Sequence, residues 1–296
     1  MRIRRFIQAI TPYLLTLPAC ALLSVFLYGV GNGIAQGFGI MPFLDKTTPT
    51  LTYYTEAFTN PDLLTSLGYS LYLSLISSVI AVMGGVILCA LLIAGKASSV
   101  TQTIAIQIPL MSAHALIAAC VVSLFAGSGL FARIFFHAGL VSGPESFPSV
   151  IGATSGWGII LVYVWKEIPF VAFSTITVMR HLSTTFGDAA ATLGASPLRT
   201  FFAVTLPLCR GAILKAFLII FAFSFGAYEV PFLLGPTLPK ALPVLAYLEF
   251  CDPDILNRCY AMALNGIIAG VCSLIALVYF AVLLREKHMC EGTTHE

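Results

Sequence analysis

The chain has 296 residues, of which 58% are hydrophobic and 9% are charged, whereas soluble globular domains carry about a quarter charged residues. Its formal net charge is +2, and no basic cluster is long enough to follow the phosphates of a nucleic acid. The composition therefore excludes an ordinary soluble domain, gives no sign of a nucleic-acid partner, and predicts a polytopic protein of the lipid bilayer.

Six apolar segments follow one another along the chain, and each reaches the length of about 20 residues that a membrane-spanning helix requires. They cover approximately residues 10–33, 67–95, 102–126, 151–179, 211–230 and 259–284. We therefore expect an all-α membrane protein with six transmembrane helices. Residues 10–284 form its single transmembrane domain, between a terminal segment of residues 1–9 and a tail of residues 285–296. No short internal repeat is evident.

The first apolar segment follows a basic start, as the core of a secretory signal peptide also does. Its apolar run matches the length of a membrane span and exceeds the core of about 7–15 residues that is typical of signal peptides. We therefore expect a retained first helix.

Basic residues gather in alternate connecting segments, which predicts the orientation of the chain. They are Arg2, Arg4, Arg5, Lys96, Arg180, Arg199, Arg210, Lys215, Arg285 and Lys287. Cytoplasmic loops of membrane proteins collect Lys and Arg. Both termini and the loop of about residues 180–210 are therefore expected on the cytoplasmic side.

That cytoplasmic loop contains the stretch DAAATLGASPLRTFFAVTLP at residues 188–207, which is neither a tight polar turn nor a span. Ser183 and Thr184 can cap the start of a helix, and Asp188 near that start favours the helix dipole. Gly194 is the residue best able to adopt the left-handed conformation that ends a helix. The pattern predicts a first short helix that ends at Gly194.

A second short helix is expected directly after this glycine. Ser196 and Pro197 are typical of an N-cap followed by proline at the first helical position. The helix is expected to run through about Val204 and to be ended by Leu206 and Pro207. The loop is thus predicted to be two short helices bent at a glycine.

The side chains of this loop suit docking onto another protein. Ala189 and Ala190 leave a face with little bulk, and apolar contact can come from Leu193, Leu198, Phe201 and Phe202. The same residues also suit an amphipathic linker that lies on the bilayer surface. The residues alone leave both interpretations open.

The order acidic-Ala-Ala, three residues, Gly, then a spaced Leu-Pro resembles the EAA loop of ABC importer permeases, the membrane subunits of binding-protein-dependent uptake systems. Here it reads Asp188-Ala189-Ala190, Gly194 and Leu206-Pro207. The segments WKEIPF at 165–170 and YEVPFLLGP at 228–236 are similar to the spermidine/putrescine permease subgroup. The resemblance covers most of the chain from the second apolar segment onward.

This resemblance implies a type I ABC importer permease fold, in which two permeases side by side form the translocation path and the loop is seated in a groove of a cytoplasmic ATPase. The residues it assigns to ATPase coupling are Asp188, Ala189, Ala190, Gly194, Ala195, Ser196, Pro197, Leu206 and Pro207. Aspartate stands at Asp188 where the family usually has the longer glutamate.

The resemblance also implies several partners. They are an ABC ATPase dimer that binds ATP and Mg, a second permease subunit that is identical or related, and an extracytoplasmic solute-binding protein. The expected location is the bacterial plasma (inner) membrane. The outer loops around residues 53–62 and 235–254 are the expected landing surface for the binding protein.

No constellation for chemistry of its own is evident in the chain. The five histidines show no metal-ligand spacing, and there is no Gly-x-x-x-x-Gly-Lys-Ser/Thr loop for a nucleotide phosphate. We therefore predict no catalytic residue, metal ligand or cofactor in this chain, which is not an enzyme. ATP hydrolysis is expected of a partner subunit.

Two carboxylates, Glu167 in the fourth apolar segment and Glu229 near the end of the fifth, are candidates for the translocation path. A charge at the centre of a spanning helix costs about 2.5–3.5 kcal/mol on insertion scales, so each is expected to face protein or water. They can attract a cationic solute, or they can be structural, with Glu167 compensated by the adjacent Lys166. His114 is expected to be a buried hydrogen-bonding residue.

We predict the permease subunit of an ATP-driven ABC importer, with a small organic cation such as a polyamine as the first hypothesis for the solute. An importer of another solute, such as an anion, a metal complex or a phosphonate, stays open. From a different class, an ATP-independent channel or a secondary transporter is the alternative. That class needs no coupling loop, so the loop of residues 183–207 discriminates between them.

Overall fold

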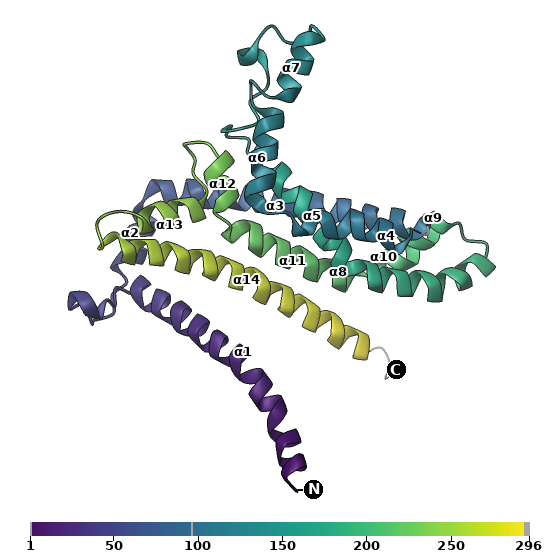
Figure 1. Cartoon of the computed structure of the whole chain (residues 1–296), viewed down its shortest axis with the longest axis horizontal. Helices are drawn as coiled ribbons and strands as arrows, with labels where there is room; N and C mark the ends of the chain where they lie inside the picture. Colours follow the sequence, from purple (N-terminus) through teal and green to yellow (C-terminus); the bar gives the residue numbers. More distant parts are fainter. Residues whose placement is uncertain (1, 96, 293–296) are drawn as a thin grey trace. The chain divides into compact units, whose positions relative to one another are not determined.

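The computed structural model describes residues 2–95 and 97–292, without the side chains of residues 2–14, 144, 188, 189, 191, 197, 198 and 282–292. The described part is almost entirely helical (Figure 1). The long helices are α1 (Arg2–Gly37), α3 (Pro61–Ala94), α8 (Trp157–Thr192), α11 (Arg210–Gly226) and α14 (Asn257–Gly292).

Shorter helices connect these elements. They are α2 (Thr52–Thr59), α4 (Ser99–Gln102), α5 (Ile108–Met111), α6 (His114–Phe125), α7 (Leu130–His137), α9 (Pro197–Thr200), α10 (Leu206–Leu208), α12 (Glu229–Leu234) and α13 (Leu242–Phe250). Two π-helical turns, η2 (Thr103–Gln107) and η4 (Phe201–Thr205), join α4 to α5 and α9 to α10. Two 3-10 turns are η1 (Pro42–Leu44) and η3 (Pro144–Ser146).

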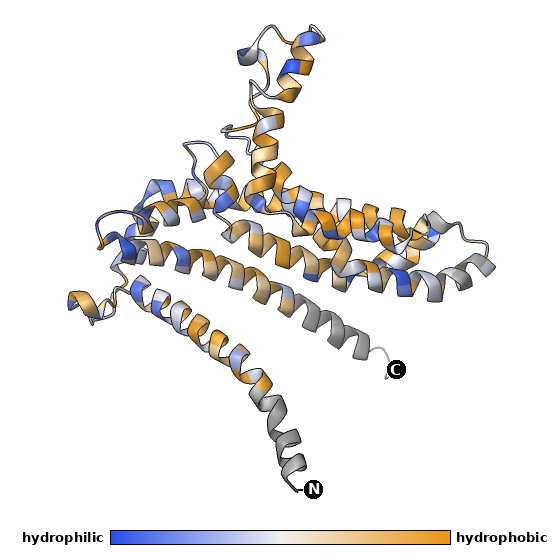
Figure 2. Cartoon of the chain, in the orientation of Figure 1, coloured by the Kyte–Doolittle hydropathy of each residue, from blue (hydrophilic) through white to orange (hydrophobic). Residues whose placement is uncertain are grey.

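Within the described part, five helical stretches are long and apolar enough to cross a membrane, and a bent pair raises this number to six. The five are Leu15–Gly37, Pro61–Ala94, His114–His137, Trp157–Gly187 and Asn257–Ala281. The bent pair consists of Phe201–Leu208 and Arg210–Gly226, which meet at 60°. Hydrophobic residues dominate these helices (Figure 2). A multi-pass membrane protein is thereby indicated, and six spans are reached when the bent pair counts as one.

Two of the predicted apolar segments are interrupted. The third was expected to be continuous over residues 102–126, but the backbone is extended at Ser112 and Ala113, so that α5 ends and α6 begins anew at His114. The fifth, expected over residues 211–230, ends at Gly226, and α12 starts after an extended Ala227. Hydropathy averages over such breaks and therefore could not reveal them.

The chain divides into two compact units, and the first consists of Met1–Asn60 with Ala246–Ile267. In this unit the Tyr54 side chain of α2 packs directly on the backbone of Gly266 in α14. A Cβ atom at Gly266 would lie 2.5 Å from the Tyr54 hydroxyl oxygen. The Tyr54 ring also contacts Phe38, with ring centroids 5.2 Å apart. The sulfur atoms of Cys259 and Met41 are 3.2 Å apart in the buried interior. Sulfur and aromatic contacts thus hold this unit together.

The second unit consists of Pro61–Leu245 with Ile268–Glu296, and α3, α8 and α11 run alongside one another in it (Figure 1). Close packing of α3 on α8 depends on Gly85, because a Cβ atom there would lie 2.6 Å from the Cβ atom of Val171. Small residues let membrane helices approach closely and gain dispersion contacts, since lipid tails remove the hydrophobic drive for association. The α3–α8 pair is therefore the frame of this unit.

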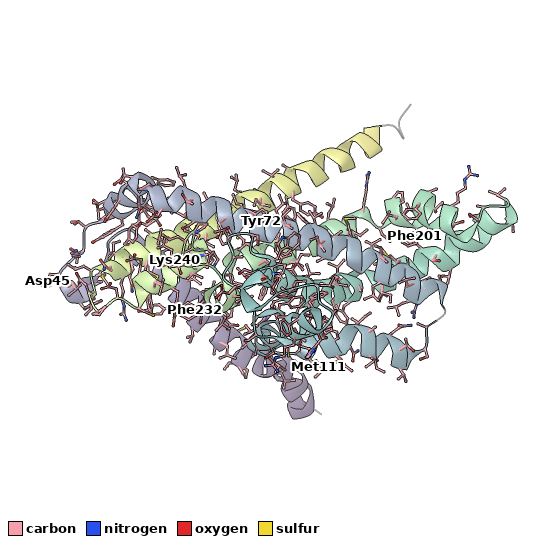
Figure 3. All side chains as sticks on the ribbon, turned by 90° about the horizontal axis from the view of Figure 1, so that it is seen from above. Asp45, Tyr72, Met111, Phe201, Phe232 and Lys240 are labelled. Carbon is pink, nitrogen blue, oxygen red and sulfur yellow. The ribbon has the colours of Figure 1, made fainter. Side chains whose placement is uncertain are left out.

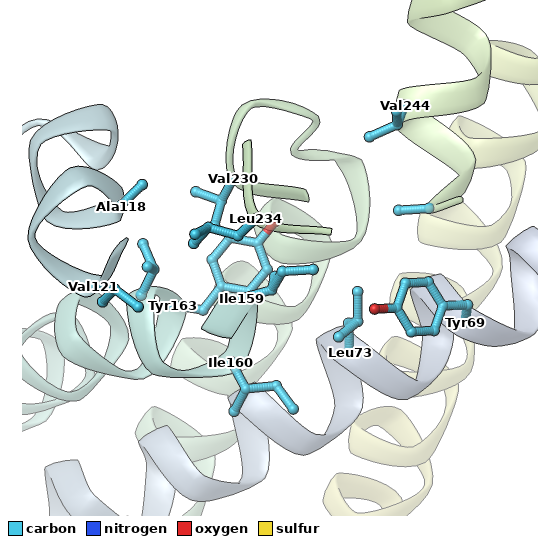
Figure 4. Close-up of a cluster of buried hydrophobic side chains, with 12 residues drawn as sticks. Tyr69, Leu73, Ala118, Val121, Ile159, Ile160, Tyr163, Val230, Leu234 and Val244 are labelled. Atoms are coloured by element: carbon cyan, nitrogen blue, oxygen red, sulfur yellow. The ribbon is translucent and has the colours of Figure 1, made fainter. Parts of the chain in front are cut away.

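Two buried clusters lie along this frame. In one, Tyr163 of α8 packs among Val230 and Leu234 of α12 and Val121 of α6 (Figure 4). In the other, Cys89 of α3 and Met179 of α8 pack with Ile106 of η2, and with Cys209 between α10 and α11. The second cluster anchors both π-helical turns against α3 and α8.

Candidate functional site

We call residues 180–210 the α8–α11 arm, since they join the end of α8 to the start of α11. The backbone turns at Gly194, whose φ of +78° lies in the left-handed region. The N–H group of Ala195 donates a hydrogen bond to the carbonyl of Ala190 at 3.0 Å, which is the six-to-one bond of a Schellman motif. Leu193 also donates to Ala190, at 3.1 Å. The predicted helix end at Gly194 is confirmed.

The predicted start of the first short helix is wrong. α8 runs without interruption from Trp157 to Thr192, so Ser183 and Thr184 lie inside it. The hydroxyl of Thr184 donates to the carbonyl oxygens of Arg180 and His181 one turn earlier. A threonine in a helix can satisfy its hydroxyl in this way without ending the helix. The first half of the arm is therefore the end of the long helix α8, whose candidate span reaches Gly187.

The second half of the arm begins as predicted and continues further than predicted. Ser196 caps α9, because its side-chain oxygen accepts from the N–H of Arg199 at 3.4 Å and its carbonyl accepts from Thr200 at 2.9 Å. The helix passes Val204 and Pro207 and ends at Leu208, through the π-helical turn η4. A wider π turn accommodates a proline ring that would clash with a regular α-helical turn.

The arm presents some apolar side chains outward and others inward. Leu193 is 88% exposed and Phe202 is 62% exposed. Phe201 and Leu206 pack against the buried cluster around Cys89 and Met179, and Figure 3 labels Phe201 at the start of η4. The neighbouring rings of Phe201 and Phe202 meet edge to face at 5.4 Å. One aromatic residue thus anchors the arm while its neighbour is available for contact.

Several residues predicted for ATPase coupling lie outside the described side chains. They are Asp188, Ala189 and Pro197, together with Leu198 of the predicted apolar face. Among the others, Ala190 and Ala195 are partly buried, while Gly194, Ser196 and Pro207 are exposed.

The second half of the arm has a structural counterpart earlier in the chain, where we expected no repeat. Ser98 caps α4 by accepting from the N–H of Thr101 at 3.2 Å, and the π turn η2 then leads to α5 with Pro109 in its first turn. Ser98 precedes Pro109 by the same distance along the chain as Ser196 precedes Pro207. The sequences AIQIPL at 105–110 and AVTLPL at 203–208 carry the signal. This repeat is hard to detect in the sequence because most positions that the two segments share are occupied by ordinary apolar residues.

A cavity of about 250 Å³ opens in the second unit between α5, α6, α8 and α11. Its lining residues are Leu110, His114, Tyr163, Lys166, Glu167, Phe170, Ile219, Ile220 and Phe223. It lies at the break between α5 and α6. Irregular backbone at membrane depth is tolerated where it lines a cavity or is buried in protein, and interrupted helices frame solute sites in many transporters.

Glu167 is 4% exposed and is one of the residues that line this cavity. The hydroxyl of Ser224 on α11 donates a hydrogen bond to Oε1, while the nearby Ser77 hydroxyl on α3 donates to the carbonyl oxygen of Ser74. The second carboxylate oxygen, Oε2, has no partner among the described residues. Glu167 therefore faces protein on one side and keeps one acceptor available.

Lys166 does not compensate Glu167, contrary to one of our two expectations. Its ammonium nitrogen donates to the carbonyl oxygen of Ser112 at 2.7 Å and lies 3.4 Å from Nδ1 of His114. Neighbouring side chains on an α-helix, with about 3.6 residues per turn, point roughly 100° apart, so adjacent charges meet different partners. His114 is held by this contact and by the ring of Phe223, whose centroid is 5.2 Å away. The expected hydrogen-bonding role is thus met, but His114 is only partly buried, contrary to the expected burial.

Glu229, the second predicted carboxylate, is exposed in the first turn of α12 and is not among the residues that line the cavity. A carboxylate at that position is favoured by the positive end of the helix dipole. Glu229 attracts both Lys166 and His114 electrostatically. The two predicted carboxylates thus differ: Glu167 is buried in the cavity lining, whereas Glu229 is exposed and acts on Lys166 only through its charge.

No protein-family model matches the chain. Its homologues are ABC transporter permeases. The inner membrane ABC transporter permease protein YdcU of Escherichia coli is 31% identical over 139 residues, 45% of this chain and 44% of that protein. The diacetylchitobiose uptake system permease protein DasB of Streptomyces coelicolor is 27% identical over 310 residues, 94% of this chain and 88% of that protein.

A putrescine transport system permease protein, PotI of Escherichia coli, is 27% identical over 145 residues, 48% of each chain. The chain thus spans about half the length of YdcU and PotI. Among solved structures, a chain of the bacterial alginate ABC transporter in complex with alginate pentasaccharide-bound periplasmic protein aligns with a TM-score of 0.70 at 18% identity. That alignment covers 94% of this chain and 96% of the other, so the fold is that of an ABC importer permease.

Proposed function

We propose that this chain is the membrane-spanning permease subunit of an ATP-driven ABC importer and forms half of a solute translocation path. The observation that supports this most is the α8–α11 arm, turned at a left-handed Gly194, on a chain that aligns almost completely with an importer permease. The homologues among ABC transporter permeases support the same conclusion.

The arm has a shape suited to transmitting force. Its exposed Leu193 and Phe202 offer apolar contacts to a groove, while Phe201 and Leu206 join it to the buried cluster with α3 and α8. An ATPase that binds the arm differently in two states shifts the equilibrium between two arrangements of the spans, because differential affinity is what moves such an equilibrium. Asp188, Ala189 and Ala190 belong to the proposed docking face, and aspartate is proposed to act there in place of glutamate.

The proposed partners follow from this role. A cytoplasmic ABC ATPase dimer binds ATP and Mg and hydrolyses ATP, a second permease completes the path, and an extracytoplasmic binding protein delivers the solute to the loops around residues 53–62 and 235–254. The solved alginate transporter, whose complex includes a periplasmic protein, supports the last of these. The proposed location is the bacterial inner membrane, with both termini cytoplasmic.

For the solute we propose a small organic cation such as a polyamine. Glu167 and Glu229 support a cation, because Glu167 lines the cavity and the negative charge of Glu229 favours a cation at the position of Lys166. PotI, named for putrescine, is one of the relatives. DasB and the alginate transporter are named for other solutes, so importers of an anion, a metal complex, a phosphonate or a sugar are the competing hypotheses.

An ATP-independent channel or secondary transporter is the alternative from another class. Such a protein has no need of a docking arm, and we find no observation that favours it over the importer.

Replacing Gly194 with valine tests the importer role. A valine at φ of +78° is strained by about 1–2 kcal/mol, while a Cβ atom there meets no neighbour within 4 Å, so only the turn is disturbed. With the chain co-expressed with an ABC ATPase and a solute-binding protein, Gly194→Val should lower ATPase co-purification, stimulated ATP hydrolysis and uptake together. Insertion into the membrane should persist.

Gly270→Val is the matched control, because Gly270 lies in helical α14, outside the arm, and a Cβ atom there meets nothing within 4 Å. It should leave all three readouts near the wild-type level. Two outcomes would show that the arm is not a coupling element. One is uptake that continues without any ATPase, and the other is a Gly194→Val variant whose three readouts equal those of the wild type.

A further inference from the structure

The ammonium group of Lys166 is held at the break between α5 and α6 by two acceptors. They are the carbonyl oxygen of Ser112, at 2.7 Å, and Nδ1 of His114, at 3.4 Å. A lysine ammonium group has three donors and no acceptor, and Nδ1 can accept when the imidazole carries its proton on Nε2. We call these two atoms the ammonium cradle.

The Ser112 carbonyl is available because the helix stops there. In a continuous helix it would accept from a backbone N–H four residues later, but the extended backbone at Ser112 and Ala113 separates α5 from α6. The end of α5 attracts a cation and the start of α6 repels one, so the helix dipoles largely offset each other at this break. The two acceptors decide the preference for an ammonium group, and the negative charge of Glu229 in the first turn of α12 adds to it.

A further acceptor belongs to a residue that lines the same cavity. Oε2 of Glu167 is buried and has no partner in the described part of the chain, and both Glu167 and Lys166 line the cavity. A buried carboxylate oxygen without a hydrogen bond keeps its desolvation cost, so the site gains when a donor arrives. The remaining lining includes Phe170, Ile219 and Phe223, which suit the apolar stem of an alkylamine.

We propose that Lys166 is a resident cation that occupies the binding site of a transported primary amine and leaves the ammonium cradle when the solute binds. This inference rests on the proposed transport function and specifies how that function recognises its solute. A solute ammonium finds the acceptors that already hold an ammonium group, and Glu167 adds one from the cavity. Lys166 therefore weakens amine binding, because its own tethered ammonium group competes with the ammonium group of the solute for the same acceptors.

Binding of putrescine to the purified full-length chain in lipid nanodiscs, measured by isothermal titration calorimetry, tests the proposal. If Lys166 fills the cradle about nine-tenths of the time, removing it tightens the apparent Kd about tenfold. Lys166→Met should show this gain. Lys166→Gln keeps a donor for the Ser112 carbonyl and should show a smaller gain. It serves as the test variant if Lys166→Met folds poorly. Lys166→Arg keeps the cation and should bind as the wild type does.

Glu229→Gln introduced into the Lys166→Met chain should weaken putrescine binding, while sorbitol should bind none of the variants. Putrescine binding that is no tighter in a folded Lys166→Met or Lys166→Gln chain than in the wild type would overturn the proposal. The proposal would also be overturned if the wild-type chain bound sorbitol or phosphate and lost this binding when Lys166 was replaced. Lys166 would then be a ligand of the solute. The measurement uses the chain without an ATPase, so its failure is distinct from failure of the coupling test at Gly194.

Discussion

At the residue scale, the contact between Glu167 and Ser224 shows how a carboxylate is kept inside a membrane protein. Glu167 is 4% exposed, and the Ser224 hydroxyl donates to it from α11. Hydrogen bonds to charged groups contribute about 1.5–3 kcal/mol, whereas a buried charge that loses its donor keeps its full desolvation cost. The stability of the α8–α11 contact should therefore be sensitive to this single hydroxyl.

We predict that Ser224→Ala lowers the free energy of unfolding by about 1.5–3 kcal/mol, because the buried carboxylate loses a donor. The midpoint temperature of thermal unfolding in detergent measures this loss. Ser174→Ala is the control, since the Ser174 hydroxyl is exposed on α8 and bonds only back to the Phe170 carbonyl. Equal melting temperatures for the two variants would mean that the Glu167–Ser224 bond contributes nothing.

At the scale of elements, the packing of α3 on α8 depends on the positions of the glycines in α3. A Cβ atom at Gly85 would approach the Val171 side chain to 2.6 Å, whereas a Cβ atom at Gly68 on the same helix meets nothing within 4 Å. Both glycines look alike in the sequence because both lie in one apolar run. Only the position of α8 distinguishes them.

Gly85→Val is expected to destabilise the protein by about 1–3 kcal/mol, the usual cost of overpacking a well-packed contact. Gly68→Val should cost far less, since its side chain enters open space. Retention of the purified chain as a monodisperse peak after heating in detergent compares the two. A Gly68→Val chain that aggregates before Gly85→Val would contradict the observed α3–α8 packing.

At the scale of the whole molecule, the number of spans decides on which sides the loops lie. Six spans place both termini on one side, and five place them on opposite sides, so the bent pair of Phe201–Leu208 and Arg210–Gly226 is decisive. The basic residues around the α8–α11 arm predict that this arm is cytoplasmic. α8 lies between the arm and the segment that follows α7, so those two regions should face opposite sides.

We expect Ser142→Cys to react with a membrane-impermeant maleimide in intact cells, and Ser196→Cys to react only after permeabilisation. Both serines are exposed, and α8 separates them. The wild-type chain, with its own cysteines, gives the background labelling. Reaction of both variants in intact cells would show that α8 does not cross the membrane or that the arm is not cytoplasmic.

The sequence alone was sufficient for features that depend on local chemistry. Apolar length predicted the spans, Gly194 predicted the left-handed turn, and Ser196 with Pro197 predicted the start of α9. Hydropathy and capping act over a few neighbouring residues, so their signals survive without knowledge of the fold. The roles of Asp188 and the other coupling residues remain predictions.

Features that depend on contacts between distant segments were decided only by the tertiary structure. Lys166 and Glu167 are adjacent in the chain, and only the positions of Ser112 on one side and Ser224 on the other show that they do not pair. The cavity likewise needs α5, α6, α8 and α11 together. The sequence determined that this protein has several apolar spans and a bent arm, because those properties are local. The structure decided which charges meet, because a buried polar group is satisfied by whatever packs against it.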